Sequence, residues 1–86
     1  MPYRILLETR ARREFLDLPD KSRGVISDAI DDLAENPRPH GSKKIVGREG
    51  YRIRKGDYRV LYVIEETEKI VRIFRVGHRR EIYRNL

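Results

Sequence analysis

The spacing of hydrophobic residues changes near residue 42, from a helical period of three to four residues to the strand period of two. Before this point, residues 3–9 are rich in apolar side chains and predict a first strand. Residues 10–18 then carry apolar side chains at helical spacing until Pro19 ends the segment. The chain is therefore expected to begin with a strand and a helix.

A second helix is predicted by apolar residues that recur at intervals of three and four, with acidic residues on the opposite side. These apolar residues are Val25, Ile26, Ala29, Ile30, Leu33 and Ala34. The helix is expected to stop at Asn36-Pro37, because proline cannot donate the backbone hydrogen bond that a helix interior needs. The two helices should form a hairpin with one apolar stripe.

Alternating apolar and polar residues predict further strands after residue 42. Their expected bounds are 42–46, 50–55, 57–64 and 69–76. This order predicts an α+β fold, with an N-terminal strand and the helix hairpin packed on one face of a mostly antiparallel sheet of about four to five strands. The other face would be free for a ligand. Residues 79–85 are expected to form a short helical or irregular tail.

A two-residue turn at Gly56-Asp57 would place arginines on one face of this sheet. The turn pairs Arg54 with Arg59, and because strand side chains alternate between faces, Arg52 shares their face. Like charges directly opposite each other on neighbouring strands are destabilising. The pattern therefore predicts an anion between Arg54 and Arg59, and the favoured anion is the phosphate backbone of RNA.

Length and charge describe one small basic domain. A chain of 86 residues forms a single domain with one small core, so residues 1–86 are taken as one unit. The net charge is +6, with +1 from residues 1–50 and +5 from residues 51–86. The basic half carries the arginines, which favours a nucleic-acid partner over a soluble surface that is basic without function.

The sequence disfavours several other classes of protein. It contains no cysteine, which excludes disulfides and thiolate chemistry and fits a reducing cytoplasm. It shows neither a signal peptide nor an apolar run long enough to cross a membrane. A phosphate-binding glycine loop, a metal-ligand set and a nucleophile elbow are also missing. We therefore expect a soluble cytoplasmic protein that uses no metal and no cofactor.

The remaining candidate chemistry belongs to arginine, tyrosine and histidine. These side chains suit metal-free RNA cleavage, in which a ribose 2′-hydroxyl attacks the adjacent phosphodiester. Arginine can hold the phosphate, but a group with a pKa above about 12 transfers protons poorly. Proton transfer therefore falls to His78 or Tyr83. Simpler interpretations are a turn residue for His78 and an amphipathic tail residue lying on the sheet for Tyr83.

Four motifs extend this interpretation, and their order and spacing matter more than any one of them. They are Tyr51-Arg-Ile-Arg, Asp57-Tyr-Arg-Val-Leu-Tyr, Val76-Gly-His-Arg-Arg and Ile82-Tyr83. Together with the opening strand and helix hairpin, they make nearly the whole chain similar to the RelE/ParE superfamily of toxins from type II toxin–antitoxin modules. The chain most resembles the RelE branch of ribosome-dependent messenger-RNA interferases.

The resemblance implies a RelE-like fold and cleavage of messenger RNA in the ribosomal A site. In that superfamily, the message is held and cleaved by side chains at the positions of Arg52, Arg54, Arg59, Arg79 and Tyr83. The best-known members carry lysine at the first two positions, so a proton-transfer role of lysine does not carry over to this chain. The segment between Arg79 and Tyr83 is also shorter here, so the position of the tyrosine in those members does not carry over directly to Tyr83. Some relatives use a histidine in the C-terminal segment, which adds His78 to the catalytic candidates.

Further basic residues are expected to contact RNA around this site. They are Lys43, Lys44, Lys55 and Arg80. Lys43 and Lys44 are explained equally well as charges that protect an edge strand from aggregation. The resemblance also implies a cognate RelB-like antitoxin, whose acidic and partly disordered chain would fold on the apolar and basic surfaces.

Two other functions stay open at this point. The gyrase-inhibiting branch of the superfamily shares the fold, and membership in it would make the protein a ParE-like, non-enzymatic binder of DNA gyrase. Retention of the basic positions argues against that branch. A basic RNA-binding module that does not cleave its ligand is excluded only weakly.

Overall fold

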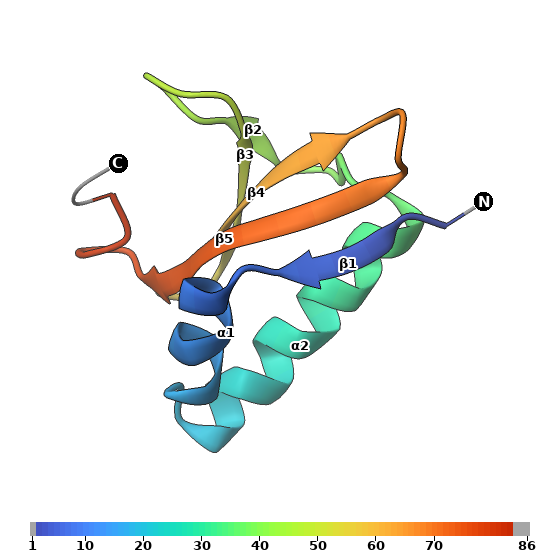
Figure 1. The fold of residues 1–86 in the computed structure, drawn as a ribbon. Helices are drawn as coiled ribbons and strands as arrows, with labels where there is room; N and C mark the ends of the chain where they lie inside the picture. Colours follow the sequence, from blue (N-terminus) through green and yellow to red (C-terminus); the bar gives the residue numbers. More distant parts are fainter. Residues whose placement is uncertain (1, 84–86) are drawn as a thin grey trace.

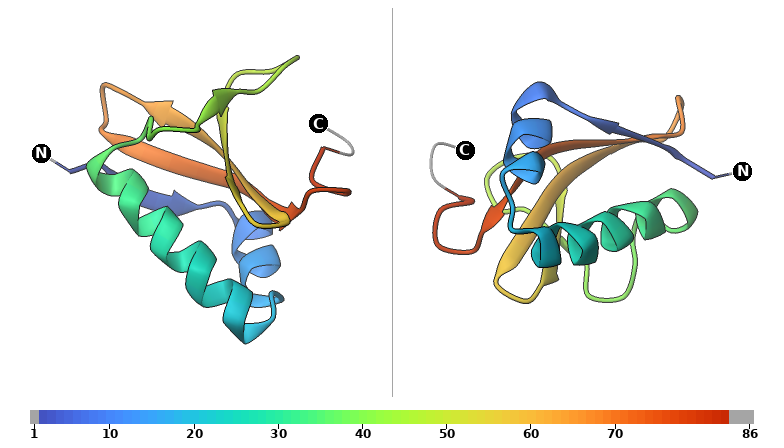
Figure 2. Two further views of the ribbon diagram at one scale, coloured as in Figure 1. Left: turned by 180° about the vertical axis from the view of Figure 1, so that it is seen from behind. Right: turned by 90° about the horizontal axis from the view of Figure 1, so that it is seen from below.

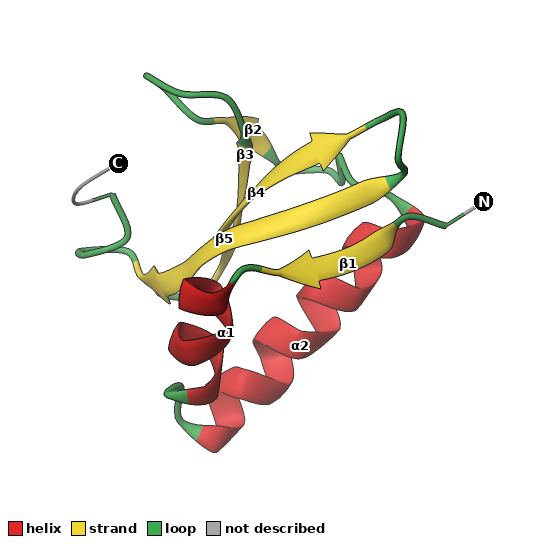
Figure 3. Cartoon of the chain, in the orientation of Figure 1, coloured by secondary structure: helices red, strands yellow, loops and turns green. Residues whose placement is uncertain are grey.

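The computed structural model describes residues 2–83 as a five-stranded sheet with two helices packed on it (Figure 1). The elements are β1 (Arg4–Leu7), α1 (Thr9–Leu16), α2 (Asp20–Glu35), β2 (Lys43–Lys44), β3 (Tyr51–Lys55), β4 (Tyr58–Glu65) and β5 (Ile70–His78). Figure 3 shows the helices together on one side of the strands. The predicted α+β fold with its helix hairpin is confirmed.

The strands lie in the order β1-β5-β4-β3-β2, so the first strand of the chain pairs with the last. β1 runs parallel to β5, whereas all other neighbouring strands are antiparallel. Figure 2 shows α2 crossing the back of the sheet and α1 beside the end of β5. The central strands β4 and β5 therefore carry the core, and β2 and β3 extend the sheet on the far side from β1.

The second strand is much shorter than predicted. It spans 2 residues, Lys43–Lys44, whereas the sequence pattern predicted residues 42–46. After it, the chain leaves the sheet through Gly47 and returns at Gly50, with φ angles of 90° and 137° that favour glycine. A Cβ atom at Gly50 would lie 2.9 Å from the carbonyl oxygen of Tyr62. Only glycine therefore fits where the chain enters β3.

The main core lies between the helices and the sheet. Its buried residues are Ala11, Leu18, Ile26, Ala29, Ile30, Leu33, Ile53, Val60, Tyr62, Val71, Ile73 and Val76. Tyr62 is fully buried, and its hydroxyl donates to the carbonyl oxygen of Pro37 at 2.6 Å. This bond holds the loop that follows α2 against the sheet.

The face of the sheet away from the helices is less open than predicted. Ile45, Leu61, Phe74 and Ile82 form a buried group on this face, which we call the second cluster. The loop between β2 and β3 and the segment 79–83 cover it. Figure 1 shows both segments on the side of the sheet opposite α2. A ligand can therefore reach only part of this face.

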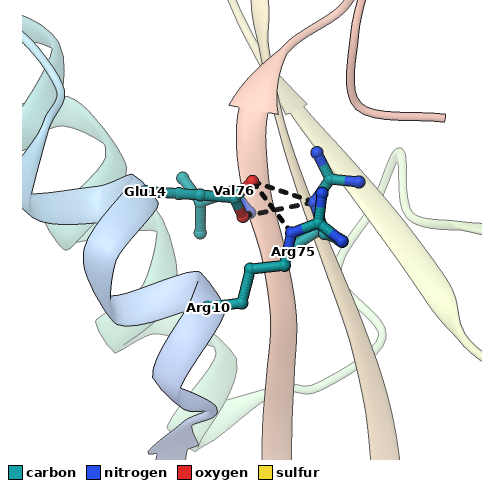
Figure 4. A network of polar contacts seen from close by, with 4 residues as sticks. All are labelled: Arg10, Glu14, Arg75 and Val76. Atoms are coloured by element: carbon teal, nitrogen blue, oxygen red, sulfur yellow. Dashed lines mark hydrogen bonds and ion pairs between the residues drawn. The ribbon is translucent and has the colours of Figure 1, made fainter. Parts of the chain in front are cut away.

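Glu14 of α1 secures β5 beyond the point where β1 stops pairing with it (Figure 4). Its carboxylate accepts hydrogen bonds from the backbone N–H of Val76 at 3.0 Å and from Nε of Arg75 at 2.9 Å. The Nε atom of Arg10 lies 3.6 Å from the same carboxylate. Beyond the end of β1, α1 thus supplies the hydrogen-bond acceptor for the edge of β5 that leads to the C-terminal segment.

We expect Glu14→Ala to lower the free energy of unfolding by about 1–3 kcal/mol, because the buried N–H of Val76 loses its acceptor. Urea denaturation measures this loss. Arg10→Ala is the matched control, because Arg10 is mostly exposed, and its expected loss is below about 1 kcal/mol. Equal losses in the two variants would show that Glu14 contributes only through surface charge.

Candidate functional site

The predicted arginine face is present. Arg54 on β3 lies directly opposite Arg59 on β4, which is the pairing expected from the turn at Gly56-Asp57. Arg52 lies opposite Leu61, a residue of the second cluster. Because paired residues project to the same face, all these arginines lie on the face away from the helices.

Arg59 occupies the centre of this face. The residue is only 8% exposed, and Nη1 donates hydrogen bonds to the carbonyl oxygens of Gly56 at 3.2 Å and Tyr58 at 3.0 Å. The turn between β3 and β4 therefore orients the guanidinium. Both of these bonds use one nitrogen, and the planar fork of arginine offers further donors to a phosphate.

The charges around Arg59 favour an anion. Burial lowers the pKa of the Arg59 guanidinium, and the positive charges of Arg54, Arg52 and Arg79 lower it further. Tyr83 acts on the same group in the opposite direction and raises the pKa. The four arginines and the tyrosine therefore lie within electrostatic reach of one point. A bound phosphate would relieve the repulsion among the guanidinium groups.

Ile82 brings the C-terminal segment onto this face. It is fully buried in the second cluster, and its Cδ1 atom would lie 3.2 Å from a Cβ atom at Gly77. Gly77 in turn lies directly opposite Arg59. The absence of a side chain at Gly77 thus lets Ile82 pack beside Arg59, which places the neighbouring Tyr83 at the site.

Arg79 is fixed by the same turn that orients Arg59. Its backbone N–H donates to the carbonyl oxygen of Asp57 at 2.7 Å, and its Nε atom lies 3.7 Å from Oδ1 of Asp57. The turn Gly56-Asp57 therefore holds two of the candidate arginines. The sequence indicated this turn, but it gave no signal for the role of the Asp57 side chain.

A hollow of about 500 Å³ adjoins the arginine face. Its lining residues are Lys43, Lys44, Ile45, Val46, Arg52 and Tyr83. The volume falls within the range of about 300–1,000 Å³ that is common for ligand sites. Both lysines border the hollow, but they pair differently with β3. Lys43 is opposite Arg52 and shares its face, whereas Lys44 is opposite Tyr51, which packs against the main core. Their contact with flanking phosphates stays a prediction.

Two predicted residues lie away from this face. His78 on β5 is directly opposite Tyr58, and their ring centroids are 5.9 Å apart in an edge-on arrangement. Tyr58 packs against the main core, so His78 projects toward the helix side, away from Arg59. Lys55 also pairs with Tyr58 and points to the helix side.

Arg80 is exposed beyond the end of β5, and its backbone N–H donates to Nδ1 of His78 at 3.2 Å. The imidazole therefore caps the turn after the strand. The alternation of side chains along β5 could not by itself predict the face to which His78 projects. A register shift between Leu61 and Tyr62 changes which residues of β5 share the face of Arg59.

Two further findings concern possible metal sites and membrane spans in the described part of the chain. Within residues 2–83, no group of three or more His, Cys, Asp or Glu side chains is arranged to hold a metal ion. No helix in the same range is both long enough and apolar enough to span a membrane.

Comparison with known proteins identifies the family. Residues 5–83 match the family model described as the ParE toxin of the type II toxin–antitoxin system parDE. The chain belongs to this toxin family. Toxin RelG of Mycobacterium tuberculosis is 36% identical to the toxin over 88 residues, covering 98% of this chain and 99% of the relative.

Solved structures of similar proteins confirm the RelE-like fold of the toxin. The RelBE2 toxin–antitoxin complex of Mycobacterium tuberculosis contains a chain with a TM-score of 0.79 and 32% identity, covering 92% of this toxin and 100% of that chain. The archaeal RelE–RelB complex of Pyrococcus horikoshii gives a TM-score of 0.78 and 25% identity, covering 94% and 99%. The predicted resemblance to the RelE branch is confirmed.

We expect Ile82→Ala to release the C-terminal segment of the toxin. Loss of a buried isoleucine costs about 2–5 kcal/mol in a core, and here the loss falls on local attachment of the segment. Trypsin cleavage after Arg79 and Arg80, followed by mass spectrometry, should accelerate at least about tenfold, which corresponds to about 1.4 kcal/mol. Val46→Ala is the control, because Val46 is 97% exposed. An unchanged cleavage rate in Ile82→Ala would contradict the anchoring role.

Proposed function

We propose that the toxin is an endoribonuclease that cleaves messenger RNA in the A site of the ribosome. The observation that carries this proposal is the arrangement of side chains around the buried Arg59. Arg54 lies directly opposite it, and the turn that orients Arg59 also holds Arg79. Arg52 and Tyr83 line the adjoining hollow together. The names of the relatives support the proposal, since they are RelE-type toxins. They do not favour the gyrase-binding alternative.

In the proposed reaction, the ribose 2′-oxygen attacks the adjacent phosphorus and the bond to the 5′-oxygen of the next nucleotide breaks. The products are a 2′,3′-cyclic phosphate and a free 5′-hydroxyl. Arg59 and Arg54 face each other across the strand pair, so both can donate to the phosphate oxygens as negative charge develops there. Arg52 and Arg79 hold the neighbouring phosphates.

Tyr83 is the proposed proton-transfer group. It is 43% exposed and lines the hollow beside Arg52, where the leaving oxygen would lie. Its phenol gives a proton to the leaving 5′-oxygen, while the proton of the 2′-hydroxyl passes to water or to a ribosomal group. His78 acts indirectly in this scheme, because it caps the turn that leads to Tyr83.

The proposed partner is a RelB-like antitoxin. The two similar solved chains described above come from toxin–antitoxin complexes, RelBE2 and RelE–RelB. Residues 51–86 carry a net charge of +5, which suits an acidic chain that folds on binding. An antitoxin on the arginine face would compete directly with RNA.

The direct test uses purified toxin, translating ribosomes and a defined message. Mapping the 5′ ends of the fragments should place the cut inside the codon that occupies the A site. The same message without ribosomes should stay intact under identical conditions. An intact message on ribosomes, together with inhibition of purified DNA gyrase, would overturn the proposal in favour of the alternative branch.

We expect binding of RNA to weaken steeply with salt. Each phosphate contact lowers the logarithm of the affinity by about 0.7 per tenfold rise in salt for a single strand, so four arginine contacts give a slope of about −3. The measurement is a titration of binding at several salt concentrations with magnesium held constant, because the ribosome requires it.

Chelators of zinc and other transition metals should leave cleavage unchanged. A loss of cleavage that added metal restores would contradict the metal-free reaction.

A further inference from the structure

The loop between β2 and β3 presents an arginine plane that the proposed reaction does not use. The guanidinium carbon of Arg48 lies 3.9 Å from the ring centroid of Phe74. Phe74 is only 7% exposed, whereas Arg48 itself is exposed. The guanidinium therefore lies over the phenyl ring, and the Arg48 side chain remains accessible to a ligand.

The backbone gives this loop a defined shape. The N–H of Ile45 donates to the carbonyl oxygen of Gly50 at 3.0 Å, which closes the loop at its base. Nε of Arg48 donates to the carbonyl oxygen of Glu49 at 3.3 Å and so limits rotation of the guanidinium. Val46 beside it is 97% exposed, which is unusual for a large apolar residue. The loop thus offers an oriented plane and an apolar side chain to a ligand.

This plane lies on the same face as the arginines. Phe74 and Leu61 belong to the second cluster, and Leu61 is directly opposite Arg52. Arg52 and Tyr83 line the hollow at the site together with Ile45 and Val46 of the loop. Arg48 lines a second hollow of about 330 Å³, which shares Lys44 and Ile45 with the first. A ligand bound to Arg52 can therefore reach Arg48 by passing Ile45 from one hollow to the next.

We propose that Arg48, supported by Phe74, is a stacking platform for a nucleobase next to the scissile phosphate. Successive nucleotides alternate a charged phosphate with a flat base. In the same way, the cationic Arg52 lines one hollow and the Arg48 guanidinium lines the adjoining one. Proteins bind single-stranded RNA by stacking its bases on aromatic rings or guanidinium planes. The proposal rests on RNA as the ligand of the proposed function, and it assigns a second binding site to that ligand.

The test separates stacking from simple charge attraction. The ribosome-bound message carries a 2′-deoxynucleotide at the cleavage site, so that the unaltered catalytic residues bind it without cutting. Arg48→Ala should weaken binding about fivefold to a hundredfold. Arg48→Lys keeps the charge and loses the plane, so it should weaken binding nearly as much. Arg12→Ala, an exposed arginine on α1, is the control and should bind like the parent.

The position of the base is found by placing one abasic nucleotide at each site around the cleavage point. At the stacked position, removing the base should weaken binding by the parent and leave the affinity of Arg48→Ala nearly unchanged. Equal losses in both proteins at every position, or parent-like binding by Arg48→Lys, would overturn stacking. A lower melting temperature with unchanged binding would assign Arg48 a structural role only.

The same message measured without ribosomes distinguishes failure of this proposal from failure of the proposed function. If the parent never cleaves a message but binds RNA with the base dependence described, the platform stands and the nuclease assignment falls. If cleavage occurs on ribosomes and Arg48→Ala binds like the parent, the platform falls alone. If the parent binds RNA in neither format, both are wrong.

Discussion

Arg59→Ala is expected to slow single-turnover cleavage of ribosome-bound message by about 10²–10³, the usual effect of removing one donor that stabilises developing charge. Arg59 is the buried centre of the cationic face, and it lies directly opposite Arg54. Its loss removes the group toward which the other charges converge. Quenched time points with excess toxin measure the rate of the chemical step.

The control must separate chemistry from folding, because Arg59 also donates to the carbonyl oxygens of Gly56 and Tyr58. Arg12→Ala removes the same charge from an exposed position on α1 and should cleave at the parent rate. Urea denaturation of both variants shows whether the turn still holds. A folded Arg59→Ala protein that is as toxic as the parent in growing cells would disprove the proposed site.

The arginine face was predictable because its geometry is local. Gly56-Asp57 forms a two-residue turn, and such a turn fixes the register of the two strands that it joins. The pairing of Arg54 with Arg59 then follows from the alternation of strand side chains. A short connection therefore let a sequence pattern specify a site.

The direction of the His78 side chain was not predictable, because it depends on a strand pairing that no short turn fixes. β4 and β5 are joined by a longer turn, and their register shifts between Leu61 and Tyr62. One extra residue in a strand exchanges the two faces for every residue beyond it. Gly77, and not His78, consequently lies opposite Arg59.

Two segments cover part of the sheet face away from the helices, and both are held there by contacts between residues far apart in the sequence. Ile82 packs over Gly77, and Arg48 lies over Phe74. Neither pair has a sequence signature, because each depends on the path of an irregular segment across the sheet. These contacts nevertheless decide which part of the arginine face a ligand can reach. The site is therefore the uncovered region between the loop and the C-terminal segment, rather than the whole face.

Tyr83→Phe is expected to slow cleavage by about 10²-fold or more, because it deletes the phenolic proton that the leaving oxygen requires. The ring remains, so the side chain keeps nearly the same shape and volume. Tyr3→Phe is the matched control, because it removes a hydroxyl that donates to Glu66 at 2.8 Å, outside the site. Its cleavage rate should equal that of the parent.

His78→Ala should cost less than about tenfold, well below the effect of a lost general acid or base. The imidazole projects to the helix side, where it contacts Tyr58 and accepts the hydrogen bond from the N–H of Arg80. Its removal loosens the turn before Tyr83 and leaves the chemistry in place. A larger loss than in Tyr83→Phe, with disappearance of a rate change near pH 6–7, would instead make His78 the proton-transfer residue. If both variants cleave at the parent rate, the toxin contributes only electrostatic clamping, and the protons must move through the ribosome or the RNA.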